Sequence, residues 1–196
     1  MEIIVELEWS FEPLTIPQLV FPWALNLANS LNIQPLTAWE IGQKYGVTMN
    51  VRHLATYFCD LDTIGLQNSP HYSATKNPVT MSLALLHEII HCTGHSTRLN
   101  RDRISHWENH PRGKRVVFTP NEEKIFDRQT AQEEIVAELG AHKLIERLGF
   151  YEPILKEELN FYIKYWSKHE PDMVQAEIDA NKAVEYVLDM AKQKAA

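Results

Sequence analysis

Apolar residues are densest between positions 81 and 92, where the chain reads MSLALLHEIIHC. Such residues cover almost the whole circumference of a helix there, which is typical of a central helix rather than a surface one. Pro78 can open the helix, and Gly94 is a natural stop after it. The pattern therefore predicts a buried helix over 81–92 at the centre of the fold.

Helical periodicity and start signals predict three more helices further along the chain. They cover residues 130–148, ended by Gly149, then 153–168, and then 171–192. The stretch from 98 to 129 is polar and contains Pro111, Gly113 and Pro120, so it is too irregular for one long element. We interpret this stretch as a segment that could lie over a functional site.

Strand signals are confined to the first third of the chain. Alternating residues on both sides of Asp60-Leu61-Asp62 predict a hairpin or paired strands between 52 and 67. Residues 1–43 carry five Glu and no Lys or Arg, with a short strand-like start and an apolar stretch near 19–31. We therefore divide the chain into an acidic N-terminal extension, residues 1–51, packed on a main domain of residues 52–196. The fold class is α+β, mostly helical with a small sheet.

Composition and charge narrow the functional classes. The 196 residues carry a formal charge of -7, which repels a phosphate backbone and makes general nucleic-acid binding an unfavoured function. Two cysteines are too few for a disulfide framework. The N-terminal residues lack the basic segment with which a secretory signal begins. No apolar run approaches the roughly 18 residues that a membrane helix needs. We expect a cytoplasmic protein with no membrane partner.

The candidate chemistry lies inside the apolar helix, where His87-Glu88-Ile89-Ile90-His91 forms an H-E-x-x-H sequence. Two histidines at i and i+4 share one helical face, so both imidazoles can bind one Zn²⁺. Glu88 lies about a quarter-turn away and is the candidate general base. The alternative is a helix with two hydrogen-bonded core histidines and a surface glutamate.

A catalytic zinc site needs three protein ligands and an open position for water. The H-E-x-x-H-x-x-G-x-x-H arrangement fails here, because Thr97 occupies the place of its third histidine. A glutamate from a second helix is the other common solution, and the segment EEIVAE at 133–138 offers candidates. The sequence therefore predicts that the third ligand comes from this segment.

Helical geometry separates the three glutamates of that segment. On the helical wheel Glu134 and Glu138 point into the apolar face, whereas Glu133 lies near its edge, toward Lys143 and Arg147. Burying an unpaired carboxylate is costly, so a metal or a metal-bound histidine explains the two inward carboxylates. We assign Glu134 to zinc and Glu138 to a hydrogen bond with the free ring nitrogen of a ligand histidine, with the two roles exchangeable. In the alternative, these glutamates only pair with Lys or Arg.

Two other histidines lie near these residues. His95 follows Gly94, which breaks the helical register, so we expect a loop residue close to the metal, in its second shell or in a structural role. His142 lies one turn beyond Glu138 and is a candidate core or second-shell residue.

The block from His87 to Arg101, HEIIHCTGHSTRLNR, resembles the zincin-like metallopeptidase domain of ArdC-type antirestriction proteins. The blocks EIVAELGA at 134–141, YIKYW at 162–166 and the alanine-rich last helix resemble that family as well, and the similarity covers roughly residues 52–190. The resemblance implies a zincin fold, with a small mixed sheet beside the active-site helix, and a protein of plasmids, phages or other mobile elements.

The chain also departs from that family. ArdC-type proteins typically carry a separate single-strand DNA-binding domain, for which residues 1–51 are too short and too acidic. Its DNA activity is therefore not carried over. A local basic island at 98–115 contains six Lys or Arg and two acidic residues. It is a possible contact for nucleic acid or an acidic partner, or else a solvated face.

We thus expect a zinc metallopeptidase that hydrolyses peptide bonds with a zinc-activated water and Glu88 as general base, in counter-defence. Its partner is a peptide or protein substrate, such as a host defence protein, added as a strand along the segment from Asp62 to Gln67. Two alternatives stay open. One is a non-proteolytic inhibitor or binding module that keeps the zinc site and blocks a host defence protein or a nucleic-acid-processing partner. The other is a structural zinc site with four protein ligands.

Overall fold

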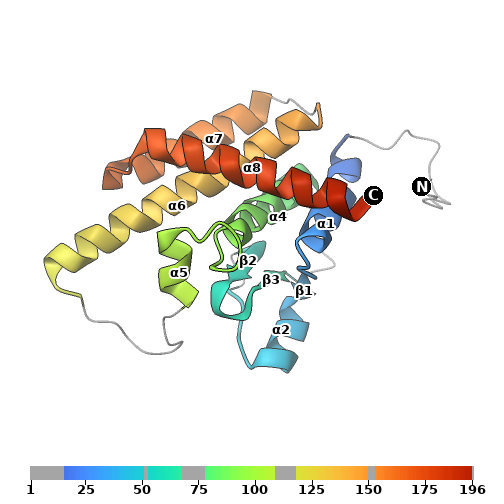
Figure 1. The fold of residues 1–196 in the computed structure, drawn as a ribbon, viewed down its shortest axis with the longest axis horizontal. Helices are drawn as coiled ribbons and strands as arrows, with labels where there is room; N and C mark the ends of the chain where they lie inside the picture. The colour runs from blue at the N-terminus through green and yellow to red at the C-terminus, as the bar shows by residue number, and fades with distance from the viewer. Residues whose placement is uncertain (1–15, 51–52, 68–77, 109–117, 150–152, 196) are drawn as a thin grey trace.

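A computed structural model describes residues 16–50, 53–67, 78–108, 118–149 and 153–195 of the chain. Most of these residues are helical, and three short strands form one sheet (Figure 1). The elements are, in chain order, α1 (Ile16–Ser30), β1 (Leu36–Thr37), α2 (Ala38–Tyr45), β2 (Ala55–Phe58), the 3-10 turn η1 (Cys59–Leu61), β3 (Thr63–Leu66), α4 (Pro78–Thr93), α5 (Asp102–Glu108), α6 (Pro120–Arg147), α7 (Pro153–Trp166), the 3-10 turn η2 (Ser167–His169) and α8 (Met173–Ala195). The strand-like start expected within residues 1–15 lies outside this description.

Helix α4 is the centre of the core, as its apolar circumference predicts. It packs against α1, α6, α8 and the sheet, and its completely buried side chains include the large apolar ones of Leu85, Leu86, Ile89 and Ile90. The helix ends at Thr93, directly before Gly94. The predicted buried helix and its stop are therefore confirmed.

Helix α6 begins at Pro120, ten residues earlier than predicted. Thr119 accepts a hydrogen bond from the Glu122 amide, and the Glu122 carboxylate accepts one from the Thr119 amide, which together form a capping box. The first three turns are polar and mostly exposed, so they carry no apolar stripe that periodicity could detect. The capping pattern, not hydrophobicity, marks the true start of this helix.

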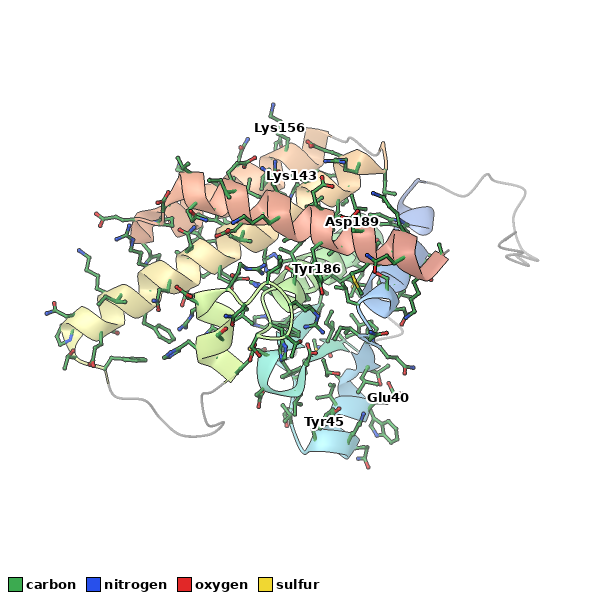
Figure 2. All side chains as sticks on the ribbon, viewed as in Figure 1. Glu40, Tyr45, Lys143, Lys156, Tyr186 and Asp189 are labelled. Atoms are coloured by element: carbon green, nitrogen blue, oxygen red, sulfur yellow. The ribbon has the colours of Figure 1, made fainter. Side chains whose placement is uncertain are left out.

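Helix α6 is enclosed on several sides by α4, α7 and α8. Figure 1 shows α8 running alongside α6 for much of its length. Lys143 and Arg147 of α6 form ion pairs with Glu177 and Glu185 of α8 (Lys143 is labelled in Figure 2). None of the described helices is both long enough and apolar enough to cross a membrane.

The sheet is mixed and has the order β1-β3-β2. β2 and β3 are antiparallel, with Ala55 opposite Leu66, which confirms the predicted strand pair. β1 is parallel to β3, with Leu36 opposite Gly65. The boundary predicted after residue 51 therefore falls between strands of one sheet.

The central position of β3 changes one prediction. A substrate strand was expected along Asp62 to Gln67, but β3 already has a neighbour on each side. Among the described strands, the outer edge beside α4 belongs to β2. The sequence could not show this, because the partner β1 comes from the N-terminal segment and is only two residues long.

Candidate metal centre

Two helices bring three candidate metal ligands together. His87 and His91 lie one turn apart on α4, and Glu134 faces them from α6. The His87 and His91 Nε2 atoms are 3.0 Å apart, and the Glu134 carboxylate lies 3.4 Å from His87 Nε2 and 3.8 Å from His91 Nε2. One donor atom from each residue can be chosen so that all three lie within 4.8 Å of one another. These are the three residues that the sequence assigns to zinc.

The other ring nitrogen of each histidine faces a carboxylate. His87 Nδ1 lies 3.3 Å from Glu138 Oε1, and His91 Nδ1 lies 3.0 Å from Glu133 Oε1. Such partners orient an imidazole and fix its tautomer, so that Nε2 is presented to a metal. Burial lowers the pKa of His87, but hydrogen bonds and charge from Glu134 and Glu138 outweigh it and raise that pKa well above the usual value.

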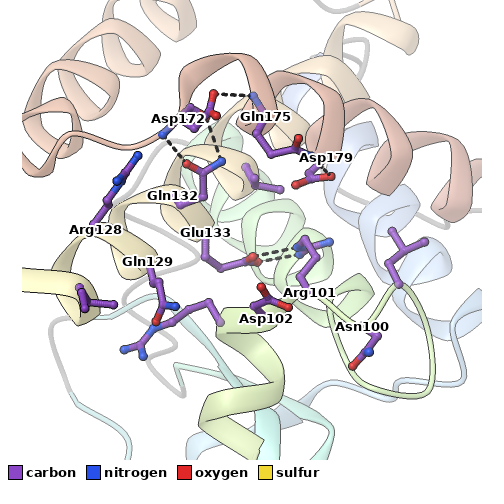
Figure 3. A pocket seen from close by; sticks show the side chains of 14 residues that line it. Asn100, Arg101, Asp102, Arg128, Gln129, Gln132, Glu133, Asp172, Gln175 and Asp179 are labelled. Atoms are coloured by element: carbon purple, nitrogen blue, oxygen red, sulfur yellow. Dashed lines mark hydrogen bonds and ion pairs between the residues drawn. The ribbon is translucent and has the colours of Figure 1, made fainter. Parts of the chain in front are cut away.

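The position of Glu133 differs from the prediction. Its side chain is only 3% exposed, and besides His91 it binds Arg101. Figure 3 shows this pair, in which Arg101 Nε and Nη2 donate to the two carboxylate oxygens at 2.8 and 2.6 Å. Burial raises the pKa of Glu133, but Arg101 and His91 outweigh it and lower the pKa to about 2. Glu133 is therefore a buried carboxylate that links His91 to a guanidinium.

The helical wheel predicted that Glu133 lies at the edge of the apolar face, because it assumed that only one face of the helix is buried. Helix α6 is instead buried on several sides, including at Val136, Ala137 and Gly140. The small residues Ala137, Gly140 and Ala141 are the signal that a neighbouring helix approaches closely. A Cβ on Gly140 would lie 2.8 Å from side-chain atoms of Ile90, so α4 and α6 touch at this point.

The loop after α4 holds the arginines of the RLNR sequence against the site. Arg98 donates to both carboxylate oxygens of Asp62, at 2.8 and 2.7 Å, and to the Cys92 carbonyl oxygen. Arg101 donates to the Ile90 carbonyl oxygen as well as to Glu133. Both arginines therefore tie the loop to the C-terminal end of α4 and to its neighbours. No local sequence pattern predicts that the two arginines of this tetrapeptide make these contacts.

These contacts also change the picture of the basic island. Besides Arg98 and Arg101, Arg103 is buried, with its guanidinium carbon 3.6 Å from the ring centre of Phe126 and 4.4 Å from that of Trp107. The guanidinium groups of the three described arginines thus contact other groups of the protein rather than forming a solvated face. The other basic residues of the island, Arg112, Lys114 and Arg115, lie outside the described ranges.

Glu88 lies beside the three candidate ligands, at the wall of the same cavity. The backbone amide of Tyr57 in β2 donates a hydrogen bond of 2.7 Å to Glu88 Oε2. An edge strand therefore holds the carboxylate that the sequence names as general base. This bond joins residues 31 positions apart, so local sequence patterns carry no sign of it.

His95, which the sequence predicts to lie near the metal, makes its described contacts with the loop after α4 and with α5. Because α4 ends at Thr93, the His95 ring leaves the ligand face; its Nδ1 bonds to the Thr97 hydroxyl at 2.8 Å and its Nε2 lies 3.7 Å from Glu108. His142 is a buried residue, and its two ring nitrogens lie 2.8 and 2.9 Å from the carbonyl oxygens of Glu138 and Leu155. Both histidines serve local structure in these contacts.

The candidate ligands open into a cavity of about 490 Å³. It runs from the outer edge of β2 at Ala55, past His87 and Glu134, to the wall formed by α7. A second cavity of about 580 Å³ has the Glu133 and Arg101 pair in its lining (Figure 3). Of these two cavities, the first is the one lined by the candidate ligands His87 and Glu134.

Comparison with known proteins gives a likeness of fold. No protein-family model matches the sequence, and no curated protein sequence matches it. Two solved structures of the antirestriction protein ArdC from plasmid R388 are similar. The metal-free form has 18% identity, a TM-score of 0.50 and coverage of 88% of this chain and 51% of ArdC. The Mn(II)-bound form has 19% identity, a TM-score of 0.48 and coverage of 87% and 52%. This chain spans about half of the ArdC length and is similar to that half in fold.

Proposed function

We propose that the chain is a zinc-dependent peptidase of the zincin type, with His87, His91 and Glu134 as metal ligands and Glu88 as general base. The observation that carries the proposal is that three donor atoms lie within 4.8 Å of one another while Glu88 lines the same cavity. A structural zinc site has four protein ligands, whereas a catalytic site has three and an open position. The three-residue cluster among the described residues supports the catalytic alternative.

The donor set fits zinc. Zinc takes imidazole nitrogen and carboxylate oxygen at about 2.0–2.2 Å, so two ligands of a tetrahedral ion lie about 3.3 Å apart. Here the two Nε2 atoms are 3.0 Å apart, while Glu134 Oε2 lies 3.4 Å from His87 Nε2 and Glu134 Oε1 lies 3.8 Å from His91 Nε2. A bound ion would polarise the carbonyl of a peptide bond and lower the pKa of a water molecule to about 7.

Glu88 supplies the proton transfer in this proposal. Its hydrogen bond from the Tyr57 amide fixes the carboxylate at the cavity wall. A carboxylate held within reach of water can accept a proton from it and deliver that proton to the leaving amine. We assign both transfers to Glu88.

The outer edge of β2 suits an extended peptide. Leu54 faces β3, because its carbonyl oxygen accepts from Gln67, whereas the Tyr57 amide faces outward to Glu88. Backbone groups alternate along a strand, so those of Ala55 also point to the outer edge, at the cavity. A substrate strand that pairs there would have its backbone beside His87 and Glu88.

The biological setting in the proposal is counter-defence. The HEIIHCTGHSTRLNR block and the fold similar to ArdC support an antirestriction role, in which a host defence protein is the substrate. The acidic charge of -7 supports a protein substrate over nucleic acid.

The test is the Glu88→Gln variant, loaded with zinc and incubated with a peptide library that is read by mass spectrometry. Gln keeps an oxygen that can accept the Tyr57 amide, so zinc content and folding should match the wild type. We expect cleavage to fall by about 10²–10⁴-fold, while the exposed control Glu123→Gln on α6 cleaves normally. Cleavage by Glu88→Gln at the wild-type rate would contradict the assigned role.

A restriction assay in cells separates hydrolysis from simple binding. If the chain protects unmodified DNA by cleaving a defence protein, zinc-loaded Glu88→Gln should lose protection. Full protection by this variant would instead indicate a binding module that keeps a metal site without using its chemistry.

A further inference from the structure

Helix α7 presents one continuous face to the candidate active-site cavity. Glu158, Tyr162 and Trp166 are spaced four residues apart, so they lie on the same side of the helix, and Tyr165 is next to them. All four line the cavity that contains His87 and Glu134. This face, which we call the α7 wall, lies across the cavity from the edge of β2.

Beside the histidines His53, His87 and His142, carboxylates supply the charge in the lining of the cavity. Four carboxylates line it, from Glu88, Glu134, Glu138 and Glu158, and its described lining contains no Lys or Arg. Glu88 is bonded to the Tyr57 amide, and Glu134 and Glu138 both face His87.

Glu158 differs from the other three carboxylates. Within the described part of the chain it is the one without a hydrogen-bond or ion-pair partner, although its side chain is partly buried. Burial, followed by the nearby charge of Glu138, raises the pKa of Glu158. A cation beside Glu158 would compensate the charge of this carboxylate and offset the repulsion from Glu138.

Aromatic rings complete the α7 wall. Tyr165 and Trp166 are in edge contact, with ring centres 4.9 Å apart, and Tyr162 is 37% exposed. The face of an aromatic ring attracts a cation and also packs against the alkyl part of a basic side chain. The chain already uses this chemistry nearby, since Lys168 Nζ lies 5.3 Å from the centre of the Tyr165 ring.

We infer that the α7 wall is the pocket for a Lys or Arg side chain of the peptide substrate, with Glu158 as its counter-ion and Tyr162 packed along its alkyl stem. The inference rests on the proposed peptidase function, because the peptide backbone is taken to lie along β2. A basic residue close to the cleaved bond would then determine which peptides are accepted. Glu158 is a specificity residue in this assignment and takes no part in proton transfer.

The experiment compares two sets of random peptides that differ at one central position, which is Arg in one set and its neutral isostere citrulline in the other. Binding to the zinc-loaded full chain is measured by fluorescence anisotropy, and cleavage of the same peptides by mass spectrometry. Charge-assisted hydrogen bonds to a partly buried carboxylate predict at least about tenfold tighter binding of the Arg set.

The variant Glu158→Gln should reduce this preference to less than about threefold while leaving binding of the citrulline set unchanged. The matched control is Glu157→Gln, the adjacent exposed residue of α7, which should keep the full preference. Equal binding of both sets by the wild type, or a preference that survives in Glu158→Gln, would overturn the inference. If the Arg set binds preferentially but nothing is cleaved, the peptidase proposal fails while the basic-side-chain pocket stands.

Discussion

At the residue scale, the candidate centre depends on carboxylates that surround two histidines. Glu134 faces the Nε2 atoms of His87 and His91, while Glu138 and Glu133 face the outer Nδ1 atoms. Partners of this kind raise the basicity of a ligand imidazole and hold its orientation. The two adjacent glutamates 133 and 134 therefore have different assignments, one as orienting residue and the other as ligand.

Glu133 gives the first prediction. The variant Glu133→Gln removes the negative charge beside Arg101, which leaves a buried guanidinium without its counter-ion. Breaking a buried ion pair costs about 3–5 kcal/mol of unfolding free energy, and loss of the orienting carboxylate weakens zinc binding by about 10–100-fold. Urea unfolding and competition with a zinc chelator measure the two effects.

The control for this variant is Glu185→Gln, which breaks the exposed pair with Arg147. It should change stability by less than about 1 kcal/mol and leave zinc affinity unchanged. Equal zinc affinity in Glu133→Gln and the wild type would mean that His91 is not oriented by Glu133.

Asp62 gives a prediction on pH. Burial raises the pKa of Asp62, but hydrogen bonds from Arg98 and Tyr57 outweigh it and hold that pKa below its ordinary value of 3.8. The folded state therefore releases the proton more readily than the unfolded chain. The resulting stability is present above pH about 4 and is lost as the pH falls through the lowered value.

We accordingly expect Asp62→Asn to be less stable than the wild type by about 1–2 kcal/mol at pH 7, with the difference shrinking toward pH 3. Urea unfolding at several pH values measures it. A difference that stays constant from pH 7 to pH 3 would show that the Asp62 charge contributes nothing.

At the element scale, the site depends on how closely α4 and α6 pack. The contact of Gly140 with Ile90 lies near the ligands, since Ile90 directly precedes His91 in α4. A larger residue at 140 would push apart the two helices that carry the candidate ligands.

The variant Gly140→Ala tests this packing. Alanine normally stabilises a helix interior by about 0.5–1 kcal/mol relative to glycine, but here overpacking against buried Ile90 predicts a net loss of about 1–3 kcal/mol. The matched control is Gly42→Ala in α2, where the nearest atom to an added Cβ is 3.7 Å away, so stability should rise or stay level. Urea midpoints compare the two, and stabilisation by Gly140→Ala would contradict the close approach.

Elements with a strong local pattern could be predicted from the sequence. The apolar helix with its H-E-x-x-H residues and the antiparallel strand pair were both found, because periodicity and spacing are local signals. The polar start of α6, the edge position of β2 and the burial of Glu133 were missed, since each depends on which distant element packs beside it. The roles of Arg98 and Arg101 were missed for the same reason.

At the scale of the whole molecule, the candidate centre joins the central helix to the long helix α6, and β2 contributes through Tyr57. An unfolded chain does not hold His87, His91 and Glu134 together, so zinc would bind the folded state selectively. Free zinc at 100 times its Kd should raise the unfolding free energy by about 2.7 kcal/mol. Thermal unfolding with zinc, manganese or a chelator measures this; an unchanged Tm with all three would argue against a metal centre.

The central claim is that His87, His91 and Glu134 together bind one divalent ion. The most direct measurement is anomalous X-ray diffraction at the zinc edge from crystals grown with zinc. We expect one strong peak bounded by the two Nε2 atoms and the Glu134 carboxylate, with no fourth protein ligand. Absence of a peak between these three side chains, or a peak at other residues only, would contradict it.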